Sequence, residues 1–130
     1  MGERYLLDTN TVIYYLDGNL PTSALDFLDI ILAIEGNISV ISQIELLSWT
    51  PPNPTDYVTV EQFVNDADIQ PLTKDIISQT ITLRKSLKIK LPDAIIAATA
   101  LAHNFTLISR NVIDFKKVPT LKLLDPFTDL

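Results

Sequence analysis

Short apolar segments alternate with helical segments along the whole 130-residue chain, and this alternation constrains the fold most strongly. Aliphatic and β-branched runs at residues 4–7, 38–41 and 105–109 are separated by longer stretches with helical spacing. Weaker strand patterns occur at 67–72 and at 120–124, and the second of these is expected near a sheet edge. Strands that alternate with helices predict a parallel sheet with helices on both faces. We therefore expect an α/β fold of three layers.

The expected helices are bounded by residues that favour helix starts and stops. Proline in a first turn and asparagine just past an end frame the segment from Pro92 to Asn104. The other expected helices are 11–16 after a cap at Thr9 or Asn10, a segment from Thr22 or Ser23 to Gly36, one that opens at Ser42, 59–65, and 74–87 after Thr73. The proline-rich segment 51–55 predicts a loop, because proline lacks an amide hydrogen.

Composition limits the class of protein and its partners. A length of 130 residues fits one domain spanning 1–130, and 47% hydrophobic against 20% charged residues argues against disorder. The absence of cysteine excludes disulfides, thiolate nucleophiles and cysteine-based zinc sites. A net charge of −6 means that contact with nucleic acid requires a local basic patch or a bound cation. No signal peptide and no membrane-length apolar run is visible, so we expect a cytoplasmic protein without a membrane partner.

Four acidic residues fall where the strands of such a sheet end. Asp8 follows the first strand, Glu45 lies one helical turn past the second, and Asp114 follows the fourth. Asp93 lies in the first turn of the helix that precedes the fourth strand. Ligands of open parallel sheets bind beyond the carboxyl ends of the strands. Carboxylates gathered there repel one another unless a hard cation such as Mg²⁺ or Mn²⁺ lies between them. Such a cation suits hydrolysis of a phosphodiester by activated water.

Each acid also has a simpler interpretation. Asp8 fits a helix cap, and Glu45 fits the capping box that opens at Ser42. Asp93 fits a carboxylate that complements a helix dipole, and Asp114 fits a solvated turn. For one residue at a time these interpretations hold at least as well as a metal site. They explain the four acids together much less well.

Several stretches match a known family in order and spacing. They are YLLDTNTVIYYL at 5–16, ISVISQIELL at 38–47, LPDAIIAATALAHNFTLISRNVIDF at 91–115 and LKLLDPF at 121–127. On these residues the chain resembles the PIN domain family and, within it, the VapC-like toxin ribonucleases of the VapBC type. The resemblance implies a PIN-like fold, a four-acid pocket that binds Mg²⁺ or Mn²⁺, and cleavage of RNA. It also implies an antitoxin partner and a homodimer.

The resemblance assigns roles to individual residues. Asp8, Glu45 and Asp93 look like three metal-binding acids. Asp114 is assigned as the fourth, although many PIN domains place this acid at the position of Asn111. The residues expected to support the acids are Asn10, Ser109 and Asn111.

Basic residues cluster on both sides of the expected pocket. Arg84, Lys85, Lys88 and Lys90 precede Asp93, and Arg110, Lys116 and Lys117 flank Asp114. Arg84, Lys85 and Arg110 are the candidates for binding the substrate, because a basic rim allows an acidic protein to bind phosphates. The alternative is that they are ordinary solvated positions.

The sequence fits three other functions less well than a nuclease. A phosphatase of the haloacid-dehalogenase type needs an aspartate two residues after Asp8, where this chain has Asn10. A receiver domain needs an acidic pair after the first strand, which the sequence DTN does not supply. A catalytically silent PIN-like module that docks RNA or protein remains the alternative, and the four acids argue against it.

Overall fold

The computed structural model describes residues 2–130 and contains a five-stranded sheet in which all neighbouring strands are parallel. The strand order is β3-β2-β1-β4-β5, so β5 lies at an edge, as expected. The strands are β1 (Tyr5–Leu7), β2 (Asn37–Ser39), β3 (Asp68–Gln70), β4 (Thr106–Ile108) and β5 (Leu123–Leu124). The predicted parallel α/β fold is therefore confirmed.

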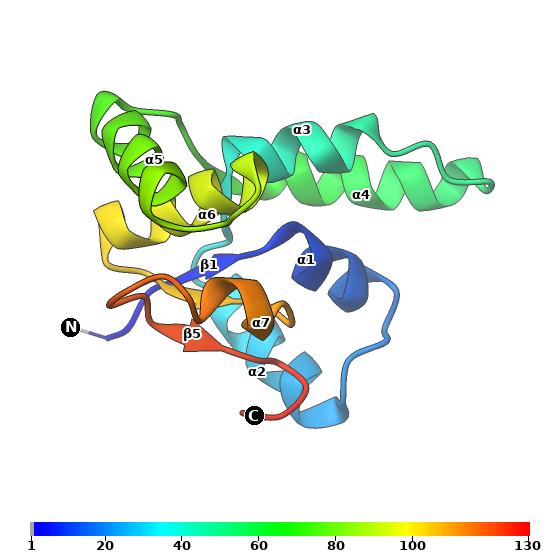
Figure 1. Cartoon of the computed structure of the whole chain (residues 1–130). Coiled ribbons are helices and arrows are strands. Elements are labelled where there is room, and N and C mark those ends of the chain that lie inside the picture. Colours follow the sequence, from blue (N-terminus) through cyan, green and yellow to red (C-terminus); the bar gives the residue numbers. More distant parts are fainter. Residues whose placement is uncertain (1) are drawn as a thin grey trace.

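Seven helices surround this sheet in the described part of the chain (Figure 1). They are α1 (Thr9–Leu16), α2 (Thr22–Leu32), α3 (Val40–Ser48), α4 (Pro54–Asp66), α5 (Lys74–Ser86), α6 (Leu91–His103) and α7 (Val112–Phe115). Helices α3 and α4 pack side by side, and so do α5 and α6. No helix within residues 2–130 has both the length and the apolar character needed to cross a bilayer.

The alternation of side chains along the strands builds two separate cores. Leu6 and Leu107 are buried in a cluster with α5, α6 and Phe115 of α7. Leu7 and Ile108, the next residues along the same strands, are buried in a cluster with α1, α2, α3 and α4. Because successive side chains of a strand point to opposite faces, one sheet separates the two cores. The result is the expected arrangement of three layers.

Several predicted boundaries were wrong, and capping side chains explain the differences. The second strand ends at Ser39, whose hydroxyl accepts from the Ile41 amide, so α3 begins at Val40 and not at Ser42. Asp8 caps α1, in place of Thr9 or Asn10. Asn53 caps α4, which includes Pro54 because proline is tolerated in a first turn. The predicted loop at 51–55 is therefore shorter and the helix predicted at 59–65 longer.

Two other boundaries differ, and two were correct. Helix α2 begins at Thr22 without a side-chain cap and ends at Leu32, before Gly36. Thr73 caps α5 through the Ile76 amide, as predicted. Asn104 ends α6 in the left-handed conformation with φ of 58°, which fits its predicted position just past the helix.

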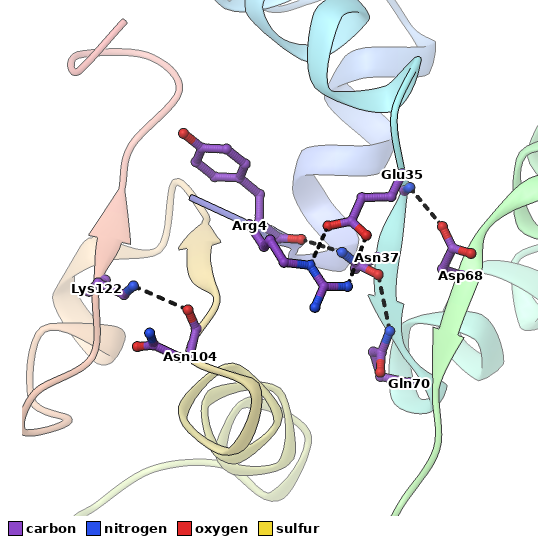
Figure 2. Close-up of polar contacts among 9 residues, drawn as sticks. Arg4, Glu35, Asn37, Asp68, Gln70, Asn104 and Lys122 are labelled. Carbon is purple, nitrogen blue, oxygen red and sulfur yellow. Dashed lines mark hydrogen bonds and ion pairs between the residues drawn. The ribbon is translucent and has the colours of Figure 1, made fainter. Parts of the chain in front are cut away.

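Polar contacts hold the amino ends of the strands together (Figure 2). The Arg4 guanidinium donates to both Glu35 carboxylate oxygens at 2.8 and 2.9 Å. The Asn37 side chain donates to the Tyr5 carbonyl and accepts from Gln70, which links β1, β2 and β3. Except for Gln70, which is the last residue of β3, these residues lie at the end of the sheet opposite to Asp8, which follows the carboxyl end of β1.

Candidate active site

Asp8 is a buried carboxylate at the junction of β1 and α1. Its side chain is the N-cap of α1 and accepts a hydrogen bond from the Thr9 amide at 2.9 Å. It also accepts from the Ser109 hydroxyl, at the carboxyl end of β4, at 2.7 Å. Burial raises the pKa of Asp8 to about 6, the charges of Asp93 and Glu45 add to this rise, and the two hydrogen bonds oppose it. The residue is 5% exposed, so water compensates its charge poorly.

Glu45 reaches the same region from α3 through a chain of hydroxyl groups. The Thr9 hydroxyl donates to Glu45 Oε1 at 2.6 Å. The same hydroxyl lies 2.8 Å from the Ser42 hydroxyl, which is buried and acts as the donor, because Thr9 has only one hydroxyl hydrogen. Thr9 therefore links the two acids, because its amide donates to Asp8 and its hydroxyl donates to Glu45. The capping-box interpretation of Glu45 is wrong, since Ser42 does not cap α3.

Asp93 lies in the first turn of α6, where no side chain caps the helix. The carboxylate is partly buried. Burial is the largest cause that raises the pKa of Asp93, followed by the charges of Asp114 and Glu45, while Lys90 lowers it. Asp93 thus experiences the fields of acids that come from two other helices.

Asp114 is held at the start of α7 by Asn111 and Lys117. The Asn111 side-chain amide donates to Asp114 Oδ2 at 3.1 Å, and Lys117 Nζ lies 3.4 Å from Oδ1. The hydrogen bond from Asn111 lowers the pKa of Asp114, and the charges of Lys117 and Lys90 contribute further. The backbone N–H of Asn111 donates to the Ser109 hydroxyl at 3.0 Å. Ser109 therefore joins Asp8 to the turn that carries Asp114.

The four acids predicted from the sequence share one electrostatic environment, but they do not form a closed ligand set. The charges of Glu45 and Asp93 reach Asp8, and those of Glu45 and Asp114 reach Asp93. Among the described residues, no three His, Cys, Asp or Glu side chains stand close enough to hold a metal ion. The oxygen donors and the unfavourable charge on Asp8 and Asp93 fit a hard divalent cation.

The residues expected to support the acids differ in their environment. Ser109 and Asn111 form the hydrogen bonds described above. Asn10 is exposed on α1. The sequence predicted Thr9 as a candidate helix cap and gave it no role in the site, although its place beside Asp8 in the first turn of α1 was a usable signal. Its partner Glu45 lies 36 positions away, and only the fold brings the two together.

Basic side chains line a cleft of about 580 Å³ beside Asp114. We call it the basic cleft; its charged residues are Arg84, Lys88, Lys90, Asp114 and Lys117. Of the predicted substrate-binding residues, Arg84 lines this cleft. Lys85 is exposed outside its lining. Arg110 lies elsewhere, with its guanidinium 3.9 Å from the centre of the Phe127 ring.

The profile of the PIN domain family matches residues 5–121. The chain belongs to the PIN domain family. The predicted resemblance is confirmed by this match, which covers the acids from Asp8 to Asp114. A comparison with proteins of curated function finds no match for this PIN domain.

Solved structures similar to this PIN domain include toxin–antitoxin complexes. VapBC2 from Rickettsia felis bound to a promoter DNA fragment is 27% identical, with a TM-score of 0.77 over 92% of this chain and 96% of that one. A toxin–antitoxin complex from Klebsiella pneumoniae is 28% identical, with a TM-score of 0.73 over 95% and 98%. VapBC-1 from Haemophilus influenzae is 25% identical, with a TM-score of 0.75 over 93% and 96%. Family and neighbours together support a nuclease of the VapC kind.

Proposed function

We propose that this PIN domain is a divalent-metal-dependent endoribonuclease and the toxin of a type II toxin–antitoxin pair. The observation that carries the proposal is the shared field of four carboxylates at the carboxyl end of the sheet, where Asp8 has a pKa of about 6. Asp8 is buried and Asp93 partly buried, and the pKa of each is raised by burial and by neighbouring acids. Such acids destabilise a protein unless they serve a function or bind a cation. Asp8, Glu45, Asp93 and Asp114 are the proposed metal-binding residues.

The chain's own groups orient these acids. Ser109 and the Thr9 amide fix the two oxygens of Asp8, and the Thr9 hydroxyl fixes Glu45. Asn111 and Lys117 hold Asp114 in the free protein. When bound, Mg²⁺ or Mn²⁺ supplies a Lewis acid that polarises a phosphodiester and makes water more acidic. No side chain is proposed as a covalent nucleophile, so the reaction is a direct hydrolysis.

The partners are proposed from the neighbours and from the surface of the chain. VapBC2 of Rickettsia felis and the Klebsiella protein are solved as complexes of toxin and antitoxin. We propose an antitoxin partner for this chain and a cytoplasmic location, where RNA is available. A homodimer is also proposed, because Ile77 and Ile81 lie one turn apart on α5 and are 43% and 51% exposed.

Cleavage of RNA with and without Mn²⁺ tests the proposal. Wild type is expected to cleave only with Mn²⁺, and Asp93→Asn is expected to lower the rate by roughly 100-fold or more. Asp75→Asn is the matched control, because Asp75 is also an aspartate in the first turn of a 13-residue helix but is exposed on α5. Asp75→Asn is expected to retain wild-type activity. This result would show that the loss in Asp93→Asn does not come from removing any aspartate in the first turn of a helix.

The competing function is a catalytically silent module that docks RNA or protein. It predicts no cleavage by wild type and no binding of Mn²⁺ by calorimetry. That result contradicts the nuclease proposal. Cleavage that is unchanged in EDTA contradicts the metal requirement.

A further inference from the structure

The basic cleft lies between the connection of α5 to α6 and helix α7. Its charged lining consists of four cations, Arg84, Lys88, Lys90 and Lys117, and one carboxylate, Asp114. Leu87 and Ile89 supply apolar surface between the cations. A volume of about 580 Å³ is typical of a ligand site.

The cations of the basic cleft are poorly neutralised by the protein itself. Within residues 2–130, neither the Lys88 nor the Lys90 ammonium forms an ion pair. Arg84 donates to the Ile89 carbonyl at 2.6 Å, a contact that leaves its charge uncompensated. Only Lys117 is paired, with Asp114 at 3.4 Å. A protein with a net charge of −6 thus gathers four of its ten basic residues in one cleft. Such a gathering favours a polyanionic ligand.

We propose that the basic cleft binds the phosphate backbone of single-stranded RNA and leads it to the acids. This inference rests on the proposed function. Asp114 lines the cleft together with the cations, and Lys90 is close enough to influence both Asp93 and Asp114. Phosphates bound by Lys88 and Lys90 are therefore adjacent to the position where a phosphodiester must lie for cleavage.

The chemistry of the lining indicates how this RNA is recognised. Lysine binds phosphate as a point charge and reads no base sequence. The apolar surface of Leu87 and Ile89 suits contact with riboses and bases, which a flexible single strand can present. The cleft therefore contributes affinity and position, and the binding is strongly dependent on salt.

Binding of a labelled oligouridine, measured by fluorescence anisotropy in EDTA, tests the proposal without cleavage. Lys88→Gln/Lys90→Gln is expected to weaken binding roughly tenfold or more at low salt, and to reduce the slope of log K against log salt by about 1.4. Lys74→Gln/Lys122→Gln removes the same charge outside the cleft and is expected to bind within about twofold of wild type. Circular dichroism confirms that both variants are folded.

The outcomes separate this proposal from the nuclease. The proposed role of the basic cleft is overturned if both double variants lose binding equally. It is also overturned if wild type does not bind at low salt. If that occurs while Asp93→Asn still abolishes cleavage, the nuclease stands without the cleft. Selective loss in the cleft variant with no cleavage by wild type supports the cleft and contradicts the nuclease. A polyglutamate that competes as strongly as RNA overturns the assignment to a nucleic acid.

Discussion

Asp8 combines two roles that oppose each other in energy. As the N-cap of α1 its carboxylate stabilises the helix, because it accepts from the Thr9 amide. As a buried acid beside Asp93 and Glu45 it destabilises the folded protein when it is ionised. The rise from 3.8 to about 6, at about 1.36 kcal/mol for each pKa unit, corresponds to roughly 3 kcal/mol at neutral pH.

Asp8→Asn is expected to stabilise the metal-free protein by roughly 1–3 kcal/mol at pH 7. Asparagine still caps the helix and carries no charge. Because the folded pKa of Asp8 is raised, wild type gains stability as the pH falls through about 6 towards 4. The advantage of the variant therefore shrinks over that range. Urea unfolding in EDTA at several pH values measures it, and identical stabilities at pH 7 would contradict the raised pKa.

Thr9→Val is expected to weaken Mn²⁺ binding by roughly tenfold, because it releases Glu45 without changing the volume of the side chain. It also leaves the buried Ser42 hydroxyl without its partner, which costs about 1–3 kcal/mol of stability. Calorimetry and urea unfolding measure the two effects. Thr9→Ser keeps the hydroxyl and is the matched control; equal Mn²⁺ affinity in both variants would show that the hydroxyl does not position Glu45.

At the scale of elements, the sequence predicted every strand but placed several helix starts wrongly. The strand patterns are local, since a short aliphatic or β-branched run is enough to recognise them. Helix starts depend on which of several neighbouring polar residues caps the helix. Ser39 and Ser42 are equally good caps by type, and Ser39 prevails because β2 ends there. The four acids were predicted as a set because strand ends share one edge of a parallel sheet. The hydroxyl chain from Ser42 to Glu45 was not, because it depends on how α1 meets α3.

Helix α6 depends on the left-handed conformation of Asn104 at its end. Asn104→Ala is expected to lower the free energy of unfolding by about 1 kcal/mol, because an alanine Cβ is strained at a φ of 58°. Asn104→Gly removes the same side chain without this strain and is expected to be at least as stable as wild type. Chemical denaturation compares the two, and an equal loss in both variants would assign the effect to the asparagine side chain instead.

At the scale of the whole molecule, the sheet separates two chemically different ends. At the amino ends of β1 and β2, the Arg4–Glu35 ion pair and the hydrogen bond from the Asn37 side chain to the Tyr5 carbonyl satisfy the polar groups (Figure 2). At the carboxyl ends, Asp8 and Asp93 repel other acids. A bound cation would therefore relieve charge repulsion at the carboxyl ends of the strands and not at the amino ends.

Mn²⁺ is expected to raise the melting temperature of wild type by several degrees. At a concentration 100 times its Kd, a ligand that binds only the folded state adds about 2.7 kcal/mol. Asp93→Asn is expected to lose most of this shift, and Asp75→Asn to retain it. Differential scanning fluorimetry in a Mn²⁺ series measures the effect. A shift of equal size in all three proteins would indicate binding elsewhere.

The uneven distribution of charge also has a kinetic consequence. A chain with a net charge of −6 repels RNA over most of its surface and attracts it at the basic cleft. The electric field then steers a diffusing RNA strand towards the cleft before any contact forms, so a larger share of collisions leads to binding. Added salt removes both the repulsion and the attraction. Because the attraction acts on the approach that leads to binding, its loss is expected to lower the association rate with ionic strength, even though the molecule as a whole carries the same sign of charge as RNA.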